Sequence, residues 1–347
     1  METLLKKVAQ FRRQSEWEHY NRKIPLTGFC MKIRIPQPSL LPDEPSLWPE
    51  NKAGVIELAN NWYDVTRVKI NDQAIEKLDF GYVPPGMETS MTSGKLGINW
   101  ANNVALSIAL NSINYQFWDL GENNEFLRYD HEGVQGAQGM RNAFERAWND
   151  SESPISQARQ GTPLTLADIQ SMFGDIPSPQ SRVDILNEVL LGSKLQQFSQ
   201  QLTENLDQTG KISTELAKEL TNAFPLAYGD ALLKKSQLAL SEVWTKALDA
   251  GQKIDCELTA FADYQIPNIL RAMGVLEYDN ALASKIDAFQ PIEPNSPDER
   301  AIRAASILAV EKIAEVTGSN VAAVDHYLWT RRKEAQTPFH LTFTTAY

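Results

Sequence analysis

The chain has 347 residues, and its fractions of hydrophobic (42%), aromatic (9%) and charged (22%) residues are those of a folded protein, which excludes a disordered chain. The formal net charge of −11 disfavours a nucleic-acid partner, because binding a polyanion depends on clustered Lys and Arg side chains. A chain of this length exceeds one small hydrophobic core, so we expect one two-lobed domain or two fused helical halves.

The first 64 residues are predicted to form an N-terminal extension or cap. It would contain an amphipathic helix over residues 1–20, a β-like stretch over residues 29–35 and a Pro-rich loop up to Pro49. Asn71 then has the side chain of a good N-cap and predicts a helix to about Leu78. Residues 81–97 are rich in Gly, Pro, Ser and Thr, which predicts a loop that could act as a flap.

Helical periodicity recurs from residue 99 almost to the end of the chain. Residues 99–118 predict a mostly buried helix. The Arg12-Arg13, Lys234-Lys235 and Arg331-Arg332-Lys333 runs are short and are expected on solvated helix faces. Further helices are predicted at about residues 139–148, 164–172, 182–206, 214–223 and 230–248.

The C-terminal part carries clear signals for where helices begin and end. Ser296 is predicted as an N-cap, with Pro297 in the first turn, Glu299 completing a capping box and Gly318 ending the helix. Ser319 is predicted to cap a last helix to about residue 334. Residues 338–347 alternate apolar with polar side chains, as expected of an extended tail that docks back onto the fold.

These patterns predict an all-α, mainly helical protein with a few short β segments near the N-terminus. Residues 65–347 would form the main domain, with lobes at approximately residues 65–210 and 211–347. Cys30 and Cys256 are far apart in sequence, and no stretch of 18 apolar residues occurs. We therefore expect a cytoplasmic protein with no disulfide framework, no membrane partner and no metal, since none of the four His residues has metal-ligand spacing.

Residues 261–276 predict a helix that is interrupted close to an acidic residue. Pro267 has no amide hydrogen for the carbonyl of Asp263, so we expect a kink that leaves this carbonyl free. The Asp263 carboxylate stands between Phe261 and Ile266 in the sequence and should be partly buried. A buried carboxylate is expected to have hydrogen-bond partners or a catalytic role. From these residues alone, a hydrogen-bonded structural Asp at a kink is the first interpretation and a catalytic carboxylate is the second.

Several short segments over about residues 65–347 follow one another in a recognisable order. They are VKIN from Val68, NYQFW from Asn114, ILNE from Ile185, Phe224-Pro225, KKSQL from Lys234, FADYQIPNIL from Phe261 with its GVLEY continuation, DHYLW from Asp325, PFH from Pro338 and Tyr347. By these segments the chain resembles the queuosine 5'-phosphate N-glycosidase family, also called queuosine salvage proteins. The FADYxxP pattern with the distant DxYLW pattern is the most specific part of the resemblance.

The resemblance implies a helical fold related to helix-hairpin-helix base-excision glycosylases. It also implies hydrolysis of queuosine 5'-phosphate to release queuine, a small-molecule reaction without a cofactor. The family's catalytic Asp falls on Asp263, and the Lys of its YKRAQ motif falls on Lys234, because Lys234-Lys235-Ser236-Gln237 aligns without a gap.

Such a reaction explains why a carboxylate would be needed. The bond between ribose C1′ and the base nitrogen breaks while positive charge grows on the sugar, and a nearby anion stabilises that charge and activates the attacking water. The 7-deazapurine base has no N7 to protonate, so its departure must be assisted elsewhere. Lys234 could contact the base or the 5'-phosphate, or set the charge state of Asp263, and the sequence does not choose among these roles.

Further side chains are candidates for substrate contacts. Queuine carries a cationic amine and a diol, so its pocket should offer acceptors and aromatic walls. The histidines and tryptophans are, however, more often structural. The candidates are Asp325 and Asn114 for base contacts, Tyr264 and Trp118 for stacking, Gln237 and His340 within matched segments, and Arg303 or Arg331 for the phosphate.

The chain departs from the family pattern at residues 129–136 and in the Thr-rich tail after His340. A glycosidase acting on a different purine or deazapurine nucleotide is therefore an alternative, as is a protein that binds queuine or its nucleotide without turnover. A nucleic-acid-binding module is a weaker rival, because Met273-Gly274-Val275-Leu276 offers one glycine and no flanking Lys for a DNA-binding hairpin. The oligomeric state is left open.

Overall fold

A computed structural model describes the protein over residues 48–78, 100–121 and 124–347. Contacts divide the chain into Met1–Pro36 and Gln37–Tyr347, and every described residue belongs to the second unit. The predicted N-terminal helix, the β-like stretch and the loop at residues 81–97 lie outside the described residues. Over these three ranges, no helix is long and apolar enough to cross a membrane.

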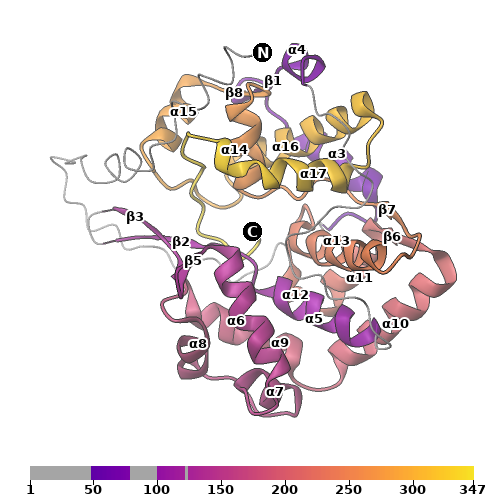
Figure 1. Ribbon diagram of the computed structural model, residues 1–347. Coiled ribbons are helices and arrows are strands. Elements are labelled where there is room, and N and C mark those ends of the chain that lie inside the picture. Colours follow the sequence, from indigo (N-terminus) through magenta and orange to yellow (C-terminus); the bar gives the residue numbers. More distant parts are fainter. Residues whose placement is uncertain (1–47, 79–99, 122–123) are drawn as a thin grey trace, which may run out of the picture. The chain divides into compact units, whose positions relative to one another are not determined.

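Helices dominate the structure and are joined by very short strands (Figure 1), which confirms the predicted class. The helices are α3 (Lys52–Trp62), α4 (Asp72–Glu76), α5 (Trp100–Ser112), α6 (Ala137–Asn149), α7 (Pro154–Arg159), α8 (Leu166–Phe173), α9 (Pro179–Leu190), α10 (Lys194–Thr209), α11 (Thr214–Ala223), α12 (Pro225–Tyr228), α13 (Lys234–Asp249), α14 (Gln265–Ala272), α15 (Asn280–Asp287), α16 (Pro297–Thr317), α17 (Val321–Thr330) and the 3-10 helix η2 (Arg332–Glu334).

The strands form two-stranded sheets, two of which join segments that are far apart in sequence. In one, β1 pairs antiparallel with β8, and in the other β6 pairs parallel with β7. The other two sheets are local hairpins of β2 with β3 and of β4 with β5. The strands are β1 (Val68–Ile70), β2 (Trp118–Leu120), β3 (Phe126–Arg128), β4 (Asp130–His131), β5 (Val134–Gln135), β6 (Lys211–Ser213), β7 (Asp255–Glu257) and β8 (Leu276–Tyr278).

The helices pack in two groups that share one large apolar core. The C-terminal helices α14, α16 and α17 pack against one another, and α3 lies along α16 (Figure 1). In the other group α5 packs against α10 and α13, while α6 contacts α7 and α8. Buried apolar side chains of both groups belong to the same core cluster. The division into lobes at residue 210 and the relation to helix-hairpin-helix glycosylases stay predictions.

The predicted extended tail does dock back onto the fold. Phe339, Leu341, Phe343 and Tyr347 are buried and form a second apolar cluster with Trp118, Leu120 and Tyr264. The backbone carbonyl of Leu341 accepts a hydrogen bond from the N–H of Ile292, and that of Tyr347 accepts one from the N–H of Gln116. The tail therefore joins the β2 region to the C-terminal helices, and the C-terminus lies between the two groups in Figure 1.

Several predicted helix ends are confirmed by their caps. The Asn71 side chain accepts a hydrogen bond from the N–H of Ala74, and the Ser296 side chain accepts one from the N–H of Glu299. Gly318 ends α16 with a φ of +63°, a left-handed conformation that glycine adopts without steric cost. The last helix differs from prediction, because α17 is capped by the side chain of Asn320, one residue after Ser319.

Two predicted helices are wrong in extent. The helix predicted over residues 182–206 is divided into α9 and α10 around Gly192, whose φ is +79°. The helix predicted over residues 99–118 ends at Ser112, and Trp118 lies on β2. Side chains from distant helices take the carbonyls there: Lys235 Nζ donates to Ser112 O at 2.8 Å, and Arg182 Nη2 donates to Tyr115 O at 2.7 Å. These donors satisfy carbonyls that the end of α5 leaves without an intrahelical partner.

Candidate active site

Asp263 lies at the end of an irregular, buried segment, residues 258–264, that connects β7 to α14. Its side chain is 9% exposed, and Oδ1 accepts hydrogen bonds from the backbone N–H groups of Gln265 (2.6 Å) and Ile266 (3.0 Å). The carboxylate therefore caps α14, where the positive end of the helix dipole attracts a negative charge. The second oxygen, Oδ2, has no hydrogen bond to any described residue, so it is the one that can act on water or substrate.

The predicted kinked helix over residues 261–276 is wrong at both ends, because α14 already ends at Ala272 and Leu276 begins β8. Residues 261–264 are not helical, and α14 begins at Gln265. Pro267 therefore stands in the first turn of α14, where a missing N–H removes no intrahelical hydrogen bond. The predicted burial of Asp263 is confirmed, with a helix start in place of a kink as its cause.

Three helices hold the segment that carries Asp263. From α13, Gln237 accepts the N–H of Thr259 at 2.8 Å and donates to its hydroxyl at 2.8 Å. From α17, Asp325 Oδ2 accepts the N–H of Phe261 at 2.8 Å. From α16, Arg303 Nε donates to the carbonyl of Ala262 at 3.0 Å. Three of the predicted substrate contacts thus fasten three of the residues just before Asp263.

Lys234 opens α13 and is buried near both acidic side chains. Burial lowers the pKa of Lys234, and the negative charges of Asp263 and Asp325 act against this lowering. The next residue, Lys235, is directed to the end of α5 and over the Tyr115 ring, at 4.7 Å from its centroid. Neither lysine lies on the solvated helix face that was expected, and only Lys234 interacts with Asp263.

Asp325 is the more deeply buried of the two acidic residues, at 3% exposure. Burial raises the pKa of Asp325 well above its ordinary value, the N–H of Phe261 acts against this, and the negative charge of Asp263 adds to the rise. The Lys234 ammonium can stabilise one of the two neighbouring carboxylates, and the negative charge of that carboxylate then favours the protonated form of the other. The arrangement can therefore supply an anion and a proton donor together.

The two predicted stacking residues belong to the same aromatic cluster. The Tyr264 ring is 4.6 Å from that of Phe339, and the Trp118 ring is 5.0 Å from that of Phe343. Trp118 Nε1 is buried and has no hydrogen-bond partner among the described residues. Both rings pack on the docked tail, and their contact with a base stays a prediction.

Asn114 and His340 have other surroundings. Asn114 is half-buried and donates to Asn111, which itself donates to Glu242 in a separate network. His340 Nε2 lies 3.2 Å from the Tyr347 hydroxyl, and burial together with the Arg303 charge lowers the pKa of His340 to about 3. The His340 ring is consequently neutral and adjoins the Arg303 side chain.

Two charged residues near the site were missed. Asp230 pairs with Arg303 through two hydrogen bonds of 2.9 and 2.7 Å and also accepts the N–H of Lys234 at 2.8 Å. Arg332 is half-buried and stacks 3.5 Å from the Trp329 ring centroid, where burial lowers its pKa and the charge of Asp263 acts against this. No carboxylate of the described residues forms an ion pair with Arg332, whereas the neighbouring Arg331 pairs with Glu334. The basic run was the only sequence signal for Arg332, and it predicted a solvated face.

Comparisons with known proteins agree on one family. The model of the family described as "Queuosine salvage protein" matches residues 99–347. A queuosine 5'-phosphate N-glycosylase/hydrolase of Sphaerobacter thermophilus is 30% identical over 264 residues, which cover 69% of this chain and 80% of that protein. Proteins of the same name are 25% identical in Mus musculus, over 67% of this chain and 78% of theirs, and in Dictyostelium discoideum, over 69% and 77%.

Proposed function

Because the chain belongs to the queuosine salvage protein family, we propose that it hydrolyses the N-glycosidic bond of queuosine 5'-phosphate and releases queuine, which is salvaged for tRNA modification. The observation that carries the proposal is the Asp263 carboxylate, buried at the start of α14 with one oxygen free of described partners and with Lys234 and Asp325 nearby. A cytoplasmic location and a small-molecule substrate are part of the same proposal.

In this mechanism Asp263 is the ionised group. Its Oδ2 stabilises the positive charge that grows at ribose C1′ and takes a proton from the attacking water. The bond from C1′ to the base nitrogen breaks, the base leaves with the electron pair, and the water oxygen bonds to C1′. The positive end of α14 and the Lys234 ammonium keep the carboxylate available for this role.

The leaving base must gain a proton, and we assign Asp325 as its donor. Asp325 is the more buried carboxyl group, it lies next to the negative Asp263, and one of its oxygens is occupied by the N–H of Phe261. Because burial and the charge of Asp263 raise the pKa of Asp325, its other oxygen is the one we propose to hold the proton and deliver it to the base. Tyr264 and Trp118 are the proposed walls of the base pocket.

The anionic end of the substrate needs a cation, and we propose Arg332 for it. The Arg303 guanidinium already donates to Asp230 and to Ala262, and Arg331 pairs with Glu334, so both earlier candidates have protein partners. Arg332 is held by the Trp329 ring and carbonyl and keeps further N–H groups for a phosphate.

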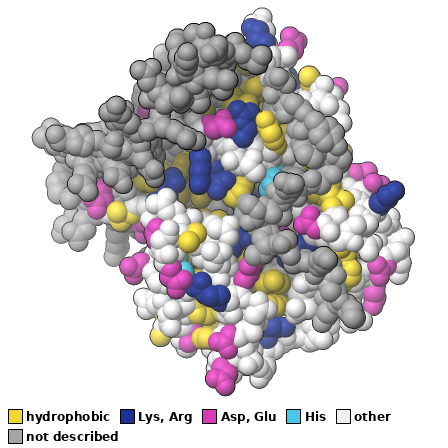
Figure 2. Space-filling model, viewed as in Figure 1, with side chains coloured by type: hydrophobic (Ala, Val, Ile, Leu, Met, Phe, Trp, Pro, Cys, Tyr) yellow, Lys and Arg dark blue, Asp and Glu magenta, His cyan; other side chains and the backbone are white. Residues whose placement is uncertain are grey.

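The charge distribution supports a mononucleotide substrate over a nucleic acid. On the face drawn in Figure 2, the Lys and Arg side chains of the described residues lie in small separate groups among acidic ones. Tracking a long phosphate backbone would need a continuous basic surface. A different purine or deazapurine nucleotide remains the second candidate substrate, and it is tested in the same assay.

The first experiment compares wild type with Asp263→Asn on queuosine 5'-phosphate and follows queuine release by chromatography. We expect a loss of about 10²-fold or more in kcat, about 2.7 kcal/mol of transition-state stabilisation. Asp279→Asn is the matched control, because Asp279 likewise accepts the backbone N–H groups two and three residues ahead, those of Ala281 and Leu282, but it caps α15 and lies outside the segment that carries Asp263. An active Asp263→Asn would remove Asp263 from the mechanism. Retention of the nucleotide by wild type without release would point to a binding protein.

A further inference from the structure

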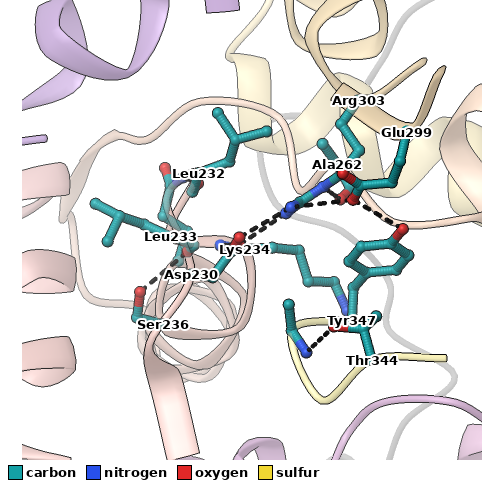
Figure 3. A network of polar contacts seen from close by, with 12 residues as sticks. Asp230, Leu232, Leu233, Lys234, Ser236, Ala262, Glu299, Arg303, Thr344 and Tyr347 are labelled. Atoms are coloured by element: carbon teal, nitrogen blue, oxygen red, sulfur yellow. Dashed lines mark hydrogen bonds and ion pairs between the residues drawn. The ribbon is translucent and has the colours of Figure 1, made fainter. Parts of the chain in front are cut away.

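Arg303 has one of the most heavily bonded buried side chains in the described part of the chain. Its Nη1 and Nη2 donate to the two carboxylate oxygens of Asp230, and its Nε donates to the carbonyl of Ala262 (Figure 3). The Glu299 carboxylate lies 3.5 Å from Nη1, and the Tyr347 ring faces the guanidinium at 4.6 Å. Arg303 and Asp230 are each 1% exposed, so this arrangement is closed to solvent.

Two of the partners of Arg303, Asp230 and Ala262, also connect to Lys234 and Asp263. Asp230 Oδ2, which receives Nη2, also accepts the backbone N–H of Lys234. Ala262, whose carbonyl receives Nε, directly precedes Asp263. A continuous chain of hydrogen bonds therefore runs from the backbone of Lys234, through Asp230 and Arg303, to the peptide group that carries Asp263.

We propose that Asp230 and Arg303 form a brace that fixes the separation of Lys234 from Asp263, so that both are positioning residues for the reaction. The inference rests on the proposed function, because it assigns Lys234 and Asp263 to one reaction. It gives Arg303 a different task from the phosphate contact expected from sequence. Glu299, Tyr347 and His340 form the outer side of the brace, since the Tyr347 hydroxyl donates to Glu299 at 3.0 Å and lies 3.2 Å from His340.

The free-energy cost of burying these charges indicates that the network fixes the orientation of its partners more than it stabilises the fold. Removing two charges from water is expensive, and well-packed apolar residues often hold elements together equally well. What an arginine adds is a planar fork whose N–H directions are fixed, so that its partners are held at defined angles. Burial raises the pKa of Asp230, but the charge and hydrogen bonds of Arg303 outweigh it and keep the group ionised. The brace is therefore complete throughout the neutral pH range.

The decisive variant is Arg303→Lys, which keeps the charge but cannot donate to both Asp230 oxygens and to Ala262 at once. We expect kcat for queuine release to fall by roughly 10²-fold while KM changes by about twofold or less, because a displacement of about 1 Å is enough for such a loss. Arg141→Lys is the matched control. Arg141 is also buried and pairs at 2.8 Å with Glu242, which lies on α13 like Lys234. The Arg141→Lys variant should lose about as much thermal stability as Arg303→Lys and keep the kcat of wild type.

A second, milder variant protects the test against misfolding. Tyr347→Phe removes one hydroxyl from the outer side of the brace and should lower kcat by about 3- to 10-fold at nearly unchanged KM. The inference is overturned if Arg303→Lys or Tyr347→Phe keeps wild-type kcat, or if Arg141→Lys lowers kcat as much as Arg303→Lys at equal loss of stability. Wild-type protein in the same assay distinguishes failure of the brace from failure of the proposed function, because absence of queuine release by wild type overturns the proposed function itself.

Discussion

Two buried ion networks are attached to α13, and only one of them reaches the segment that carries Asp263. At the start of the helix, Asp230 pairs with Arg303, whose Nε continues to a backbone carbonyl of that segment. Farther along, Glu242 accepts hydrogen bonds from Arg141 and Asn111 and pairs with Lys246. All partners of Glu242 lie on α5, α6 and α13 themselves.

The difference lies in where each network ends. Burial acts to raise the pKa of Glu242, and two cations outweigh it, so the pKa is lowered and the charge is balanced within the helices. The Arg303 network instead ends on a loop that has no helical hydrogen bonds to hold it. Buried charge is therefore no sign of function by itself. A buried ion network indicates function when it fixes irregular backbone next to a candidate catalytic group.

The largest expected effects come from removing the carboxylate of each network. Asp230→Ala and Glu242→Ala should each cost about 3–5 kcal/mol of unfolding free energy, because each leaves a buried arginine without its partner. Urea unfolding measures this cost, and kcat per folded molecule is measured at low temperature. We expect kcat to fall by at least about 10-fold for Asp230→Ala alone. Equal kcat values for the two variants would remove the proposed distinction between the networks.

The fold was predictable where local signals decide it and not where distant side chains do. Ser296 and Gly318 mark the ends of α16 with their own caps, so the sequence is sufficient there. At the end of α5, the carbonyls of Ser112 and Tyr115 are instead satisfied by Lys235 and Arg182, which lie more than 60 residues away along the chain. Apolar periodicity over residues 99–118 contains no trace of those contacts, because they form only after the helices have packed.

The candidate site was predictable as a set of motif positions but not as an arrangement. The segment FADYQIPNIL singled out Asp263, yet other motif residues serve the fold, as Glu188 does when it accepts the N–H groups of Leu226 and Ala227. Arg303 was expected at the phosphate because a lone arginine gives no hint of its partner. Asp230 lies 73 residues before it, and only the packing of α16 on the loop before α13 brings the two together.

A smaller effect on stability should appear at acidic pH and should come from His340, which adjoins the Arg303 network. The pKa of His340, lowered to about 3 by burial and the Arg303 charge, lies below the ordinary value of about 6.5, so the unfolded chain binds a proton that the folded chain does not. Stability contributed by neutral His340 is present above about pH 6.5 and is lost as pH falls towards about 3, which amounts to about 2 kcal/mol at about pH 5. Thermal unfolding of His340→Gln should lack this part of the loss. An equal loss of stability on acidification in wild type and in His340→Gln would contradict the attribution of this loss to His340.

The last expected change in stability concerns Asp325, and its pH dependence has the opposite sign. The folded pKa of Asp325 is raised, so its favourable contribution is present below its unfolded value of about 3.9 and is lost as pH rises. Asp325→Asn keeps an oxygen for the N–H of Phe261 and cannot ionise, so its melting temperature relative to that of wild type should rise as pH rises above about 4. Its kcat should fall by about 10-fold or more, because the base loses its proton donor. A group that is costly to the fold and necessary for turnover serves the reaction. If the melting temperatures of both proteins followed pH in parallel, Asp325 would not retain its proton in the folded protein, and the proton for the base would have to come from Lys234.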